Sequence, residues 1–297
     1  MIESALLKHL WAQTDLLAPY LAVYKGKMAI FNQEAPADTD RGWETKSQYG
    51  RLVFALDLNE DTERKYSGTL AVDVICEKGK QLPEEMEPIV RKLIDGYFFS
   101  TEETTMAAQW NASNYFTDAT EKIIGVTLTF GMLAFPKQLT CGPDPIALLN
   151  AWTSTELKSI LQRNIRVIGH DTMEDAWKPT NEVPAIYWRL SHINPTAWIP
   201  DTLNCSWHTA VISGHIMAPD KDVSALITRL ISNHLTLKRR LIFEDQSPLM
   251  VDRNLRINLG QDQMRTGQIT IDAVYGILNS YPYTPIQNLS VRIKEGI

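Results

Sequence analysis

The sequence predicts an α+β protein of two similar domains, each a mostly antiparallel sheet with helices packed on one face. Three observations lead to this class. Apolar segments recur in the same order at a spacing of about 140 residues, the strand-like segments alternate with period two, and one helical stripe is repeated without a gap. The length of 297 residues suits two domains. We expect a first copy at 1–139 and a second copy, with a C-terminal tail, at 140–297.

Each copy opens with a predicted helix. Residues 3–17 place apolar side chains on one face, and Pro19 ends the run. In the second copy Asp144 is the expected N-cap, and Pro145 suits the first helical position. Thr153, with a glutamate three residues later, predicts a capping box that starts a further short helix.

Two strands follow the opening helix in each copy. Residues 52–58 and 69–76 are the predicted strands of the first copy, and 185–190 and 206–217 are those of the second. In 69–76 the apolar side chains share one face and Asp73 lies on the other. The connections between the strands differ in composition, which is typical of surface loops.

The central helices match best between the copies. Apolar residues recur at the same helical steps in Met86–Ile94 and in Val223–Ile231, which predicts one buried face for each helix. Gly96 and Asn233 stand at equivalent positions after these stripes. Both residue types tolerate the left-handed conformation that ends a helix, so we expect both helices to end there.

A final strand is predicted to close each copy. Residues 126–130 and 269–273 alternate apolar side chains with hydroxyl or acidic ones. Between the central helix and this strand we expect variable loops, at 100–121 in the first copy and at about 236–266 in the second. Each copy therefore reads as helix, strands, helix, loops and strand.

Composition excludes some functional classes. The formal net charge of −6 argues against a nucleic-acid binder, because neutralising phosphates needs a basic face, and the run 238–240 is expected to be a solvated helix end. Cys76, Cys141 and Cys205 are widely spaced, which suits a reducing compartment or a protein indifferent to redox. Cys76 and Cys205 lie in or beside apolar strand-like runs and are expected to be small buried side chains. No apolar stretch approaches the roughly 20 residues of a membrane span, so no membrane partner is expected.

The sequence contains no common constellation of catalytic or metal-binding residues. Residues 77–80 lack the upstream glycine of a P-loop, and neither G-x-G-x-x-G nor G-x-S-x-G occurs. His208 and His215 are an odd number of positions apart on one predicted strand, so they cannot share a metal ion. Asp73 is expected to face solvent or a partner subunit rather than act as a general base. We therefore expect no cofactor, no metal and no enzymatic activity.

The predicted loops carry the candidate interface residues. Aromatic and arginine side chains among small polar residues are typical of protein–protein contacts. The alternative is that they belong to ordinary surface loops that cover the sheet edges. Their occurrence in both copies favours assembly. The candidates are Trp110, Tyr115, Phe116, Trp198, Arg239, Arg240, Arg253 and Arg256.

The order of elements resembles that of the tail-terminator, or tail-completion, proteins of long-tailed bacteriophages and related injection machines. The resemblance rests on the opening amphipathic helix, a strand Gly68–Cys76, a helix Ile89–Asp95 and a closing strand Gly125–Phe130. It covers most of 1–136 and, more weakly, 144–278. It is a resemblance of pattern and order, without a catalytic motif.

The resemblance implies a structural role in the virion. Proteins of this family form a six-fold ring on the end of the tail tube, stop its polymerisation and present a surface to the neck or head–tail connector, without a cofactor. The implied partners are further copies of the chain, the tail tube protein and the neck or connector protein, with the sheath as a further candidate and DNA only as passing cargo. The implied location is the tail or neck of the virion, assembled in the cytoplasm of the bacterial host.

The apparent duplication leaves the subunit count open. The chain is about twice the usual length of that family, so either three chains or six could close a ring. Two other functional classes remain. Another ring-forming tail component, such as a tube, baseplate or head–tail joining protein, shares small α+β units and ring symmetry. An enzyme is the third class, because loops can assemble a site from distant residues, and a deep pocket around Asp73 would favour it.

Overall fold

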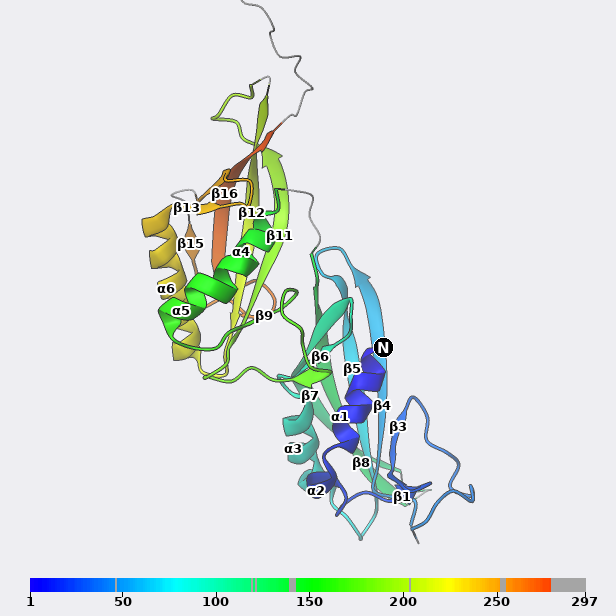
Figure 1. Ribbon diagram of the computed structural model, residues 1–297. Helices are drawn as coiled ribbons and strands as arrows, with labels where there is room; N and C mark the ends of the chain where they lie inside the picture. The colour runs from blue at the N-terminus through cyan, green and yellow to red at the C-terminus, as the bar shows by residue number, and fades with distance from the viewer. Residues whose placement is uncertain are drawn as a thin grey trace, which may run out of the picture.

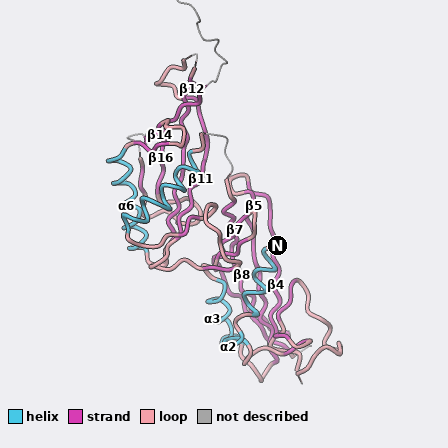
Figure 2. Tube along the Cα trace, viewed as in Figure 1, coloured by secondary structure: helices cyan, strands magenta, loops and turns pink. Residues whose placement is uncertain are grey.

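The computed structural model shows two curled, mostly antiparallel sheets with helices on one face of each (Figure 1, Figure 2). This confirms the predicted α+β class with two sheet domains. Each domain has its own buried cluster, formed between its helices and one face of its sheet. The structure describes residues 1–278 apart from positions 46, 119, 121, 139–142, 203 and 252–254.

The opening helix of the first domain is broken in two. Helix α1 (Ile2–Trp11) is followed by the single turn α2 (Thr14–Leu17), because the backbone leaves the helical region at Gln13. The prediction of one helix over 3–17 was wrong on this point. The predicted apolar face is nevertheless buried, since the break lets the second turn bend back onto the same core.

The central helix of the first domain agrees with its prediction. Helix α3 (Pro83–Ile94) buries Met86, Val90, Leu93 and Ile94, with a proline in its first turn. Gly96 follows with a φ of 74°, a left-handed conformation that glycine adopts without strain. The chain can therefore turn sharply into the next strand.

The first sheet is built on two long hairpins. Their strands run beyond the predicted limits 52–58, 69–76 and 126–130. The strand over 126–130 continues into an apolar run that is buried on both faces, whereas the other two continue into hairpin ends that leave the core and lose the apolar alternation. Residues 59–61, expected in a loop, belong to such an end. The strands are β3 (Ile30–Asn32), β4 (Arg51–Asp61), β5 (Lys65–Glu77), β6 (Phe98–Ser100), β7 (Thr104–Asp118) and β8 (Ile123–Pro136), and a separate hairpin joins β1 (Val23–Tyr24) to β2 (Lys27–Met28).

The second domain also opens with a helix. In α4 (Pro145–Trp152) the Asp144 carboxylate accepts hydrogen bonds from the backbone N–H groups of Ile146 and Ala147, at 2.8 and 3.0 Å, as the cap prediction requires. The predicted capping box was wrong. The Thr153 hydroxyl donates to the Leu149 carbonyl at 2.7 Å, so the helix continues through a π-helical stretch into α5 (Lys158–Leu161).

The central helix of the second domain departs from its prediction. Helix α6 (Lys221–Lys238) runs through Asn233 and ends where Arg239 adopts a left-handed conformation. It continues because Leu235 extends the buried stripe of Ile227 and Ile231 by another turn. The expected buried face 223–231 was therefore wrong in part, and Leu226 is 49% exposed. The small polar side chains of Ser224, Thr228 and Ser232 are buried on this helix while Leu226 is exposed.

The second sheet repeats the strand order of the first. The first sheet has the order β6-β7-β8-β5-β4-β3, and the second has β13-β14-β16-β12-β11-β9. In both, the last strand of the order, β3 or β9, runs parallel to its neighbour, and the other pairings in these orders are antiparallel. The strands are β9 (Arg166–Val167), β11 (Ala185–Pro195), β12 (Cys205–Met217), β13 (Arg240–Ile242), β14 (Pro248–Val251) and β16 (Ile269–Leu278), with β15 (Arg256–Ile257) beside β16.

The second domain adds one strand to the sheet of the first at their junction. Strand β10 (Ala176–Trp177) lies in the chain between β9 and β11 of the second domain, but it pairs with β6 at the edge of the first sheet. A shared apolar cluster joins Phe98 and Phe135 of the first domain to Tyr187 and Met217 of the second. The junction is therefore a β-pairing backed by buried side chains.

Candidate interaction surface

The aromatic candidates of the first domain lie on a strand. Segment 100–121 was predicted to be a loop, but most of it forms β7, which pairs with β8 along its length. The prediction was wrong because small and polar residues interrupt the apolar alternation. Backbone hydrogen bonds to β8 stabilise the strand although its own sequence lacks that pattern. The aromatic side chains are therefore presented on a sheet.

Trp110 is part of the domain's own packing. The Arg91 guanidinium of α3 lies 3.8 Å from the centre of its ring. Its indole N–H donates to the Ser113 hydroxyl at 3.1 Å, and that hydroxyl donates to the Glu87 carboxylate at 2.8 Å. These contacts join α3 to β7, so Trp110 is a structural residue rather than a free contact.

Phe116 and Tyr115 differ in what they offer a partner. The Phe116 ring lies over Gly125, where an added Cβ would approach it to 2.3 Å. Phe116 thus fills a space that the glycine leaves open. Tyr115 is 54% exposed, so it is the one of the three aromatic candidates that presents much of its side chain to solvent.

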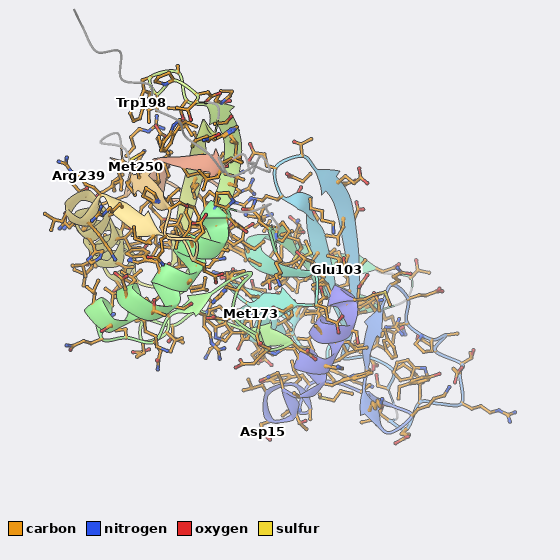
Figure 3. The ribbon with its side chains drawn as sticks, turned by 45° about the horizontal axis from the view of Figure 1, so that its top comes forward. Asp15, Glu103, Met173, Trp198, Arg239 and Met250 are labelled. Atoms are coloured by element: carbon orange, nitrogen blue, oxygen red, sulfur yellow. The ribbon has the colours of Figure 1, made fainter. Side chains whose placement is uncertain are left out.

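The candidates of the second domain do not form one cluster. Figure 3 shows Trp198 and Arg239 at different places on that domain. Trp198 is 66% exposed in the connection between β11 and β12. Arg256 pairs with the Asp272 carboxylate at 3.3 Å on a neighbouring strand. Arg253 lies outside the described residues.

Arg239 and Arg240 stand at the edge of the second sheet. Arg239 ends α6, and Arg240 begins β13, the outermost strand. Two apolar side chains are exposed beside them, Leu237 at the end of the helix and Ile242 on the strand. We call residues 237–242 the β13 edge. It combines positive charge, apolar surface and a strand side that pairs with no other strand among the described residues, the features that sheet-edge contacts use.

Sequence reasoning missed a buried cluster at the junction. Arg64, 4% exposed, donates to the carbonyl groups of Ala134, Met264 and Arg265, and so binds both domains. His215 is fully buried, and its Nδ1 lies 2.9 Å from the Gln263 carbonyl oxygen. Arg64 lies in the hairpin turn between β4 and β5, and His215 is an isolated histidine in the sequence. Both features are common, so no local pattern marks these two residues as partners.

Electrostatics at the junction favour neutral side chains. Burial lowers the pKa of His215 to about 3, and the nearby Arg64 guanidinium acts in the same direction. Burial also raises the pKa of Tyr187 to about 12. Neither side chain exchanges a proton near neutral pH, so this cluster is suited to holding the domains together rather than to acid–base catalysis.

An open depression of about 950 Å³ lies beside the junction. Its lining includes Glu103 and Met173, both labelled in Figure 3. Carboxylates and amines are mixed along it, and Lys8 pairs with Asp175 at 3.1 Å. The depression therefore has the character of a mixed-charge surface.

The single residues considered for chemistry have structural contacts. Asp73 accepts a hydrogen bond from the Thr127 hydroxyl at 2.6 Å on the neighbouring strand. His208 and His215 lie on opposite faces of β12, as predicted: the His208 ring is 6.0 Å from Tyr275 of the second core, and His215 belongs to the junction. Within the described residues, no group of three or more His, Cys, Asp or Glu side chains is arranged to hold a metal ion.

No protein-family model matches the sequence, and no curated protein is significantly similar to it. In the part of the chain that the structure describes, every helix is too short or too polar to cross a membrane. Function must therefore be argued from the arrangement of the two domains.

Proposed function

We propose that the protein is a structural component of a phage or phage-like tail. In this proposal it forms a ring that caps the tail tube and joins the tube to the neck or head connector. The observation that carries the proposal is the way in which the two equivalent domains are joined.

The domains are joined through unlike edges. The first domain uses its β6 edge, and the second uses the segment that follows its β9 edge. The equivalents of these two edges, β3 in the first domain and β13 in the second, lie at the ends of their sheets. A contact between unlike surfaces is heterologous, and repeating it closes a ring when the rotation allows.

Element order supports the tail assignment. Each domain runs from an opening helix through a hairpin to a central helix and a closing strand, which is the order on which the resemblance to tail terminators rests. Three chains would present six equivalent domains around a tube, and six chains would present an additional layer. The formal charge of −6 suits a ring whose lumen lets DNA pass without gripping it.

The first test of the proposal is assembly. The purified chain should form closed rings, measured by mass photometry and imaged by negative-stain microscopy. A chain that stays monomeric at every concentration tested, alone and with tube protein, would contradict the proposal.

The second test separates a terminator from other ring-forming tail components. The chain is added to tail tube protein during polymerisation. A terminator should bind one end and shorten the tubes, as seen by microscopy. A tube protein would instead enter the tubes along their length, and a baseplate or head–tail joining protein would leave their length unchanged.

A further inference from the structure

We propose that the β13 edge of one chain binds residues 33–45 of a second copy of the chain. We call residues 33–45 the donor segment. The inference rests on the proposed function, because it names the contact that would hold neighbouring chains in the ring. The same kind of contact is already present once within each chain.

The contact within the chain is a strand added to a sheet edge. Trp177 of β10 pairs with Phe98 of β6, and the two rings are 5.6 Å apart. The backbone N–H of Ser100 donates to the Asp175 carbonyl at 3.0 Å. At the end of α3, Lys178 donates to the Asp95 carbonyl at 2.6 Å. The second domain thus covers the β6 edge of the first.

The donor segment occupies the corresponding place in the first domain. Segment 168–184, which contains β10, connects β9 to β11, and residues 33–50 connect β3 to β4. Trp177 lies nine residues before Ile186, a buried residue paired with β9, and Trp43 lies nine residues before Leu52, a buried residue paired with β3. Trp43 is therefore the equivalent of the tryptophan in β10.

Backbone groups at the β13 edge point outward. The Arg239 carbonyl accepts from the N–H of Val251, and the N–H of Phe243 donates to the Ser247 carbonyl. These backbone groups of Arg239 and Phe243 therefore face the β14 side of the hairpin. Along an antiparallel strand alternate residues bond to opposite sides. The N–H and C=O groups of Arg240 and Ile242 therefore face away, and among the described residues no strand pairs with that side.

One side of the donor segment pairs with no strand among the described residues. Gly42 accepts from Lys25, and Glu44 donates to Val23, so these two residues pair with the β1 hairpin. The backbone groups of Trp43, between them, point the other way. The indole N–H of Trp43 donates to the Ala37 carbonyl at 3.0 Å. The segment is thus held in shape before binding, which reduces the entropy cost of docking.

Charge is complementary between the two surfaces. The donor segment carries four carboxylates, Glu34, Asp38, Asp40 and Glu44, and the cation Arg41. Asp38 already pairs with Arg51 at 2.6 Å, and the segment keeps an excess of negative charge. Within the described residues, no ion pair involves the guanidinium of Arg239 or Arg240 on the β13 edge. The Glu44 carboxylate accepts a hydrogen bond from the N–H of Gly26 at 2.7 Å. Because Glu44 follows Trp43 as Lys178 follows Trp177, the same docking would bring it to the end of α6, where these arginines lie.

Apolar surface at the β13 edge supports the same docking. Leu237 is 85% exposed and Ile242 is 43% exposed. Exposed apolar side chains gathered beside an open strand are typical of an interaction site. A strand laid along β13 would cover Ile242 and approach Leu237, as β10 covers the edge of the first sheet.

The test is a charge exchange measured as assembly. Arg240→Glu and Glu44→Lys should each raise the dissociation constant of the ring by about tenfold or more, because each places like charges together. The variant that carries both changes should regain most of the affinity. Arg229→Glu is the control, since it makes the same change of charge at an exposed position elsewhere on α6. Circular dichroism checks that each variant is folded.

A backbone variant tests the strand pairing itself. Ile242→Pro removes the outward N–H of β13 without removing a bond to β14. It should weaken assembly by about tenfold as well, because a sheet-edge contact depends on main-chain hydrogen bonds. Rings that form normally with Ile242→Pro and with Arg240→Glu would overturn this inference but leave the proposed ring intact. A wild-type chain that never assembles would overturn both.

Two results would assign the β13 edge to a different occupant. If Arg240→Glu weakens the ring and adding Glu44→Lys does not restore it, the edge binds something other than the donor segment. Hydrogen exchange of the wild-type monomer gives the second result. Slow exchange at Arg240 and Ile242 that becomes fast when residues 279–297 are removed would assign the edge to the chain's own C-terminal tail. Either result overturns the proposal.

Discussion

His215 shows how burial at the junction sets the behaviour of one side chain. It has no exposed surface, its ring lies 5.8 Å from Tyr187 and 6.2 Å from Phe135, and it lies near Arg64. Burial, followed by the effect of that guanidinium, lowers its pKa to about 3. The folded protein therefore holds this histidine in the neutral form.

Stability should fall on mild acidification through His215. The unfolded chain takes up a proton near pH 6.5 and the folded chain only near pH 3, so the unfolded state binds more protons between these values. The free energy of unfolding should then fall by about 1 kcal/mol between pH 7.5 and 5.5. Urea unfolding at the two pH values measures it. Burial also lowers the pKa of His9, which adds a loss of the same sign.

A pair of variants separates the contribution of His215. His215→Gln keeps a donor for the Gln263 carbonyl and should reduce the loss on acidification, leaving the part due to His9. His192→Gln, at an exposed position, is the control for the substitution. The prediction would be contradicted if the free energy of unfolding of His215→Gln fell as much between pH 7.5 and 5.5 as that of the wild type.

Single residues were predictable where one strand or helix turn decides their surroundings. Cys76 is buried in the first core, as expected, and burial raises the pKa of its thiol to about 11, so it is an unreactive side chain. Arg64 and His215 were not predictable, because each acquires its role from residues of the other domain. Trp110 was not predictable either, because its contacts come from α3, a different element of its own domain.

Close backbone approach decides the geometry of the first sheet. At Gly68 on β5, an added Cβ would lie 2.0 Å from the carbonyl oxygen of Asp57 on β4. A backbone atom cannot move without disturbing the strand pairing. At Gly131 on β8, the nearest atom would be the Asn111 side-chain amide at 3.2 Å, and a side chain can turn aside.

These two glycines give an element-scale prediction. Gly68→Ala should lower the free energy of unfolding by about 1–3 kcal/mol, because the strands must separate to admit the methyl group. Gly131→Ala is the matched control and should cost less than about 1 kcal/mol. Urea midpoints of the two variants provide the measurement. Equal losses of free energy of unfolding in the two variants would show that the close contact at Gly68 does not cause the destabilisation.

Elements were predictable when their own periodicity matched their surroundings. The stripe of α3 agrees with its buried face. Helix α6 and strand β7 were misread, since buried Ser224 and Thr228 hide the inward face of the helix and polar residues hide the strand. In both cases the neighbouring sheet supplies burial and hydrogen bonds that local sequence does not reveal.

The two domains should behave as one cooperative unit. They share a strand pairing, an apolar cluster and the buried Arg64, whose guanidinium also lies 4.9 Å from the centre of the Phe135 ring. Unfolding one domain would expose these surfaces on the other. We therefore expect a single thermal transition for the whole chain.

Removal of Arg64 should separate the domains energetically. Arg64→Ala loses hydrogen bonds from a charged donor to Ala134, Met264 and Arg265, and should lower the free energy of unfolding by about 2–3 kcal/mol. Calorimetry should then show two transitions, or a van't Hoff enthalpy below the calorimetric one. Arg229→Ala, an exposed change on α6, should stay within about 0.5 kcal/mol of wild type. One sharp transition in Arg64→Ala would contradict the shared role.

The sequence by itself determined several elements and their buried faces. Period-two alternation in β5, β8 and β16, the Asp144 cap and the stripe of α3 follow from residues that are neighbours in the chain. Local side-chain spacing dictates which face is apolar, and burial of that face follows wherever the chain folds. The α+β class with two sheets could therefore be predicted.

Tertiary structure alone decided how the sheets end and meet. The placement of β10 on the first sheet, the junction around Arg64 and the open β13 edge all depend on backbone groups and side chains far apart in sequence. No local pattern encodes such pairing, because hydrogen bonds between strands join any extended segments that three-dimensional packing brings together. The proposed assembly surface, with Arg239 and Arg240 at the outer edge of β13, is a property of that arrangement.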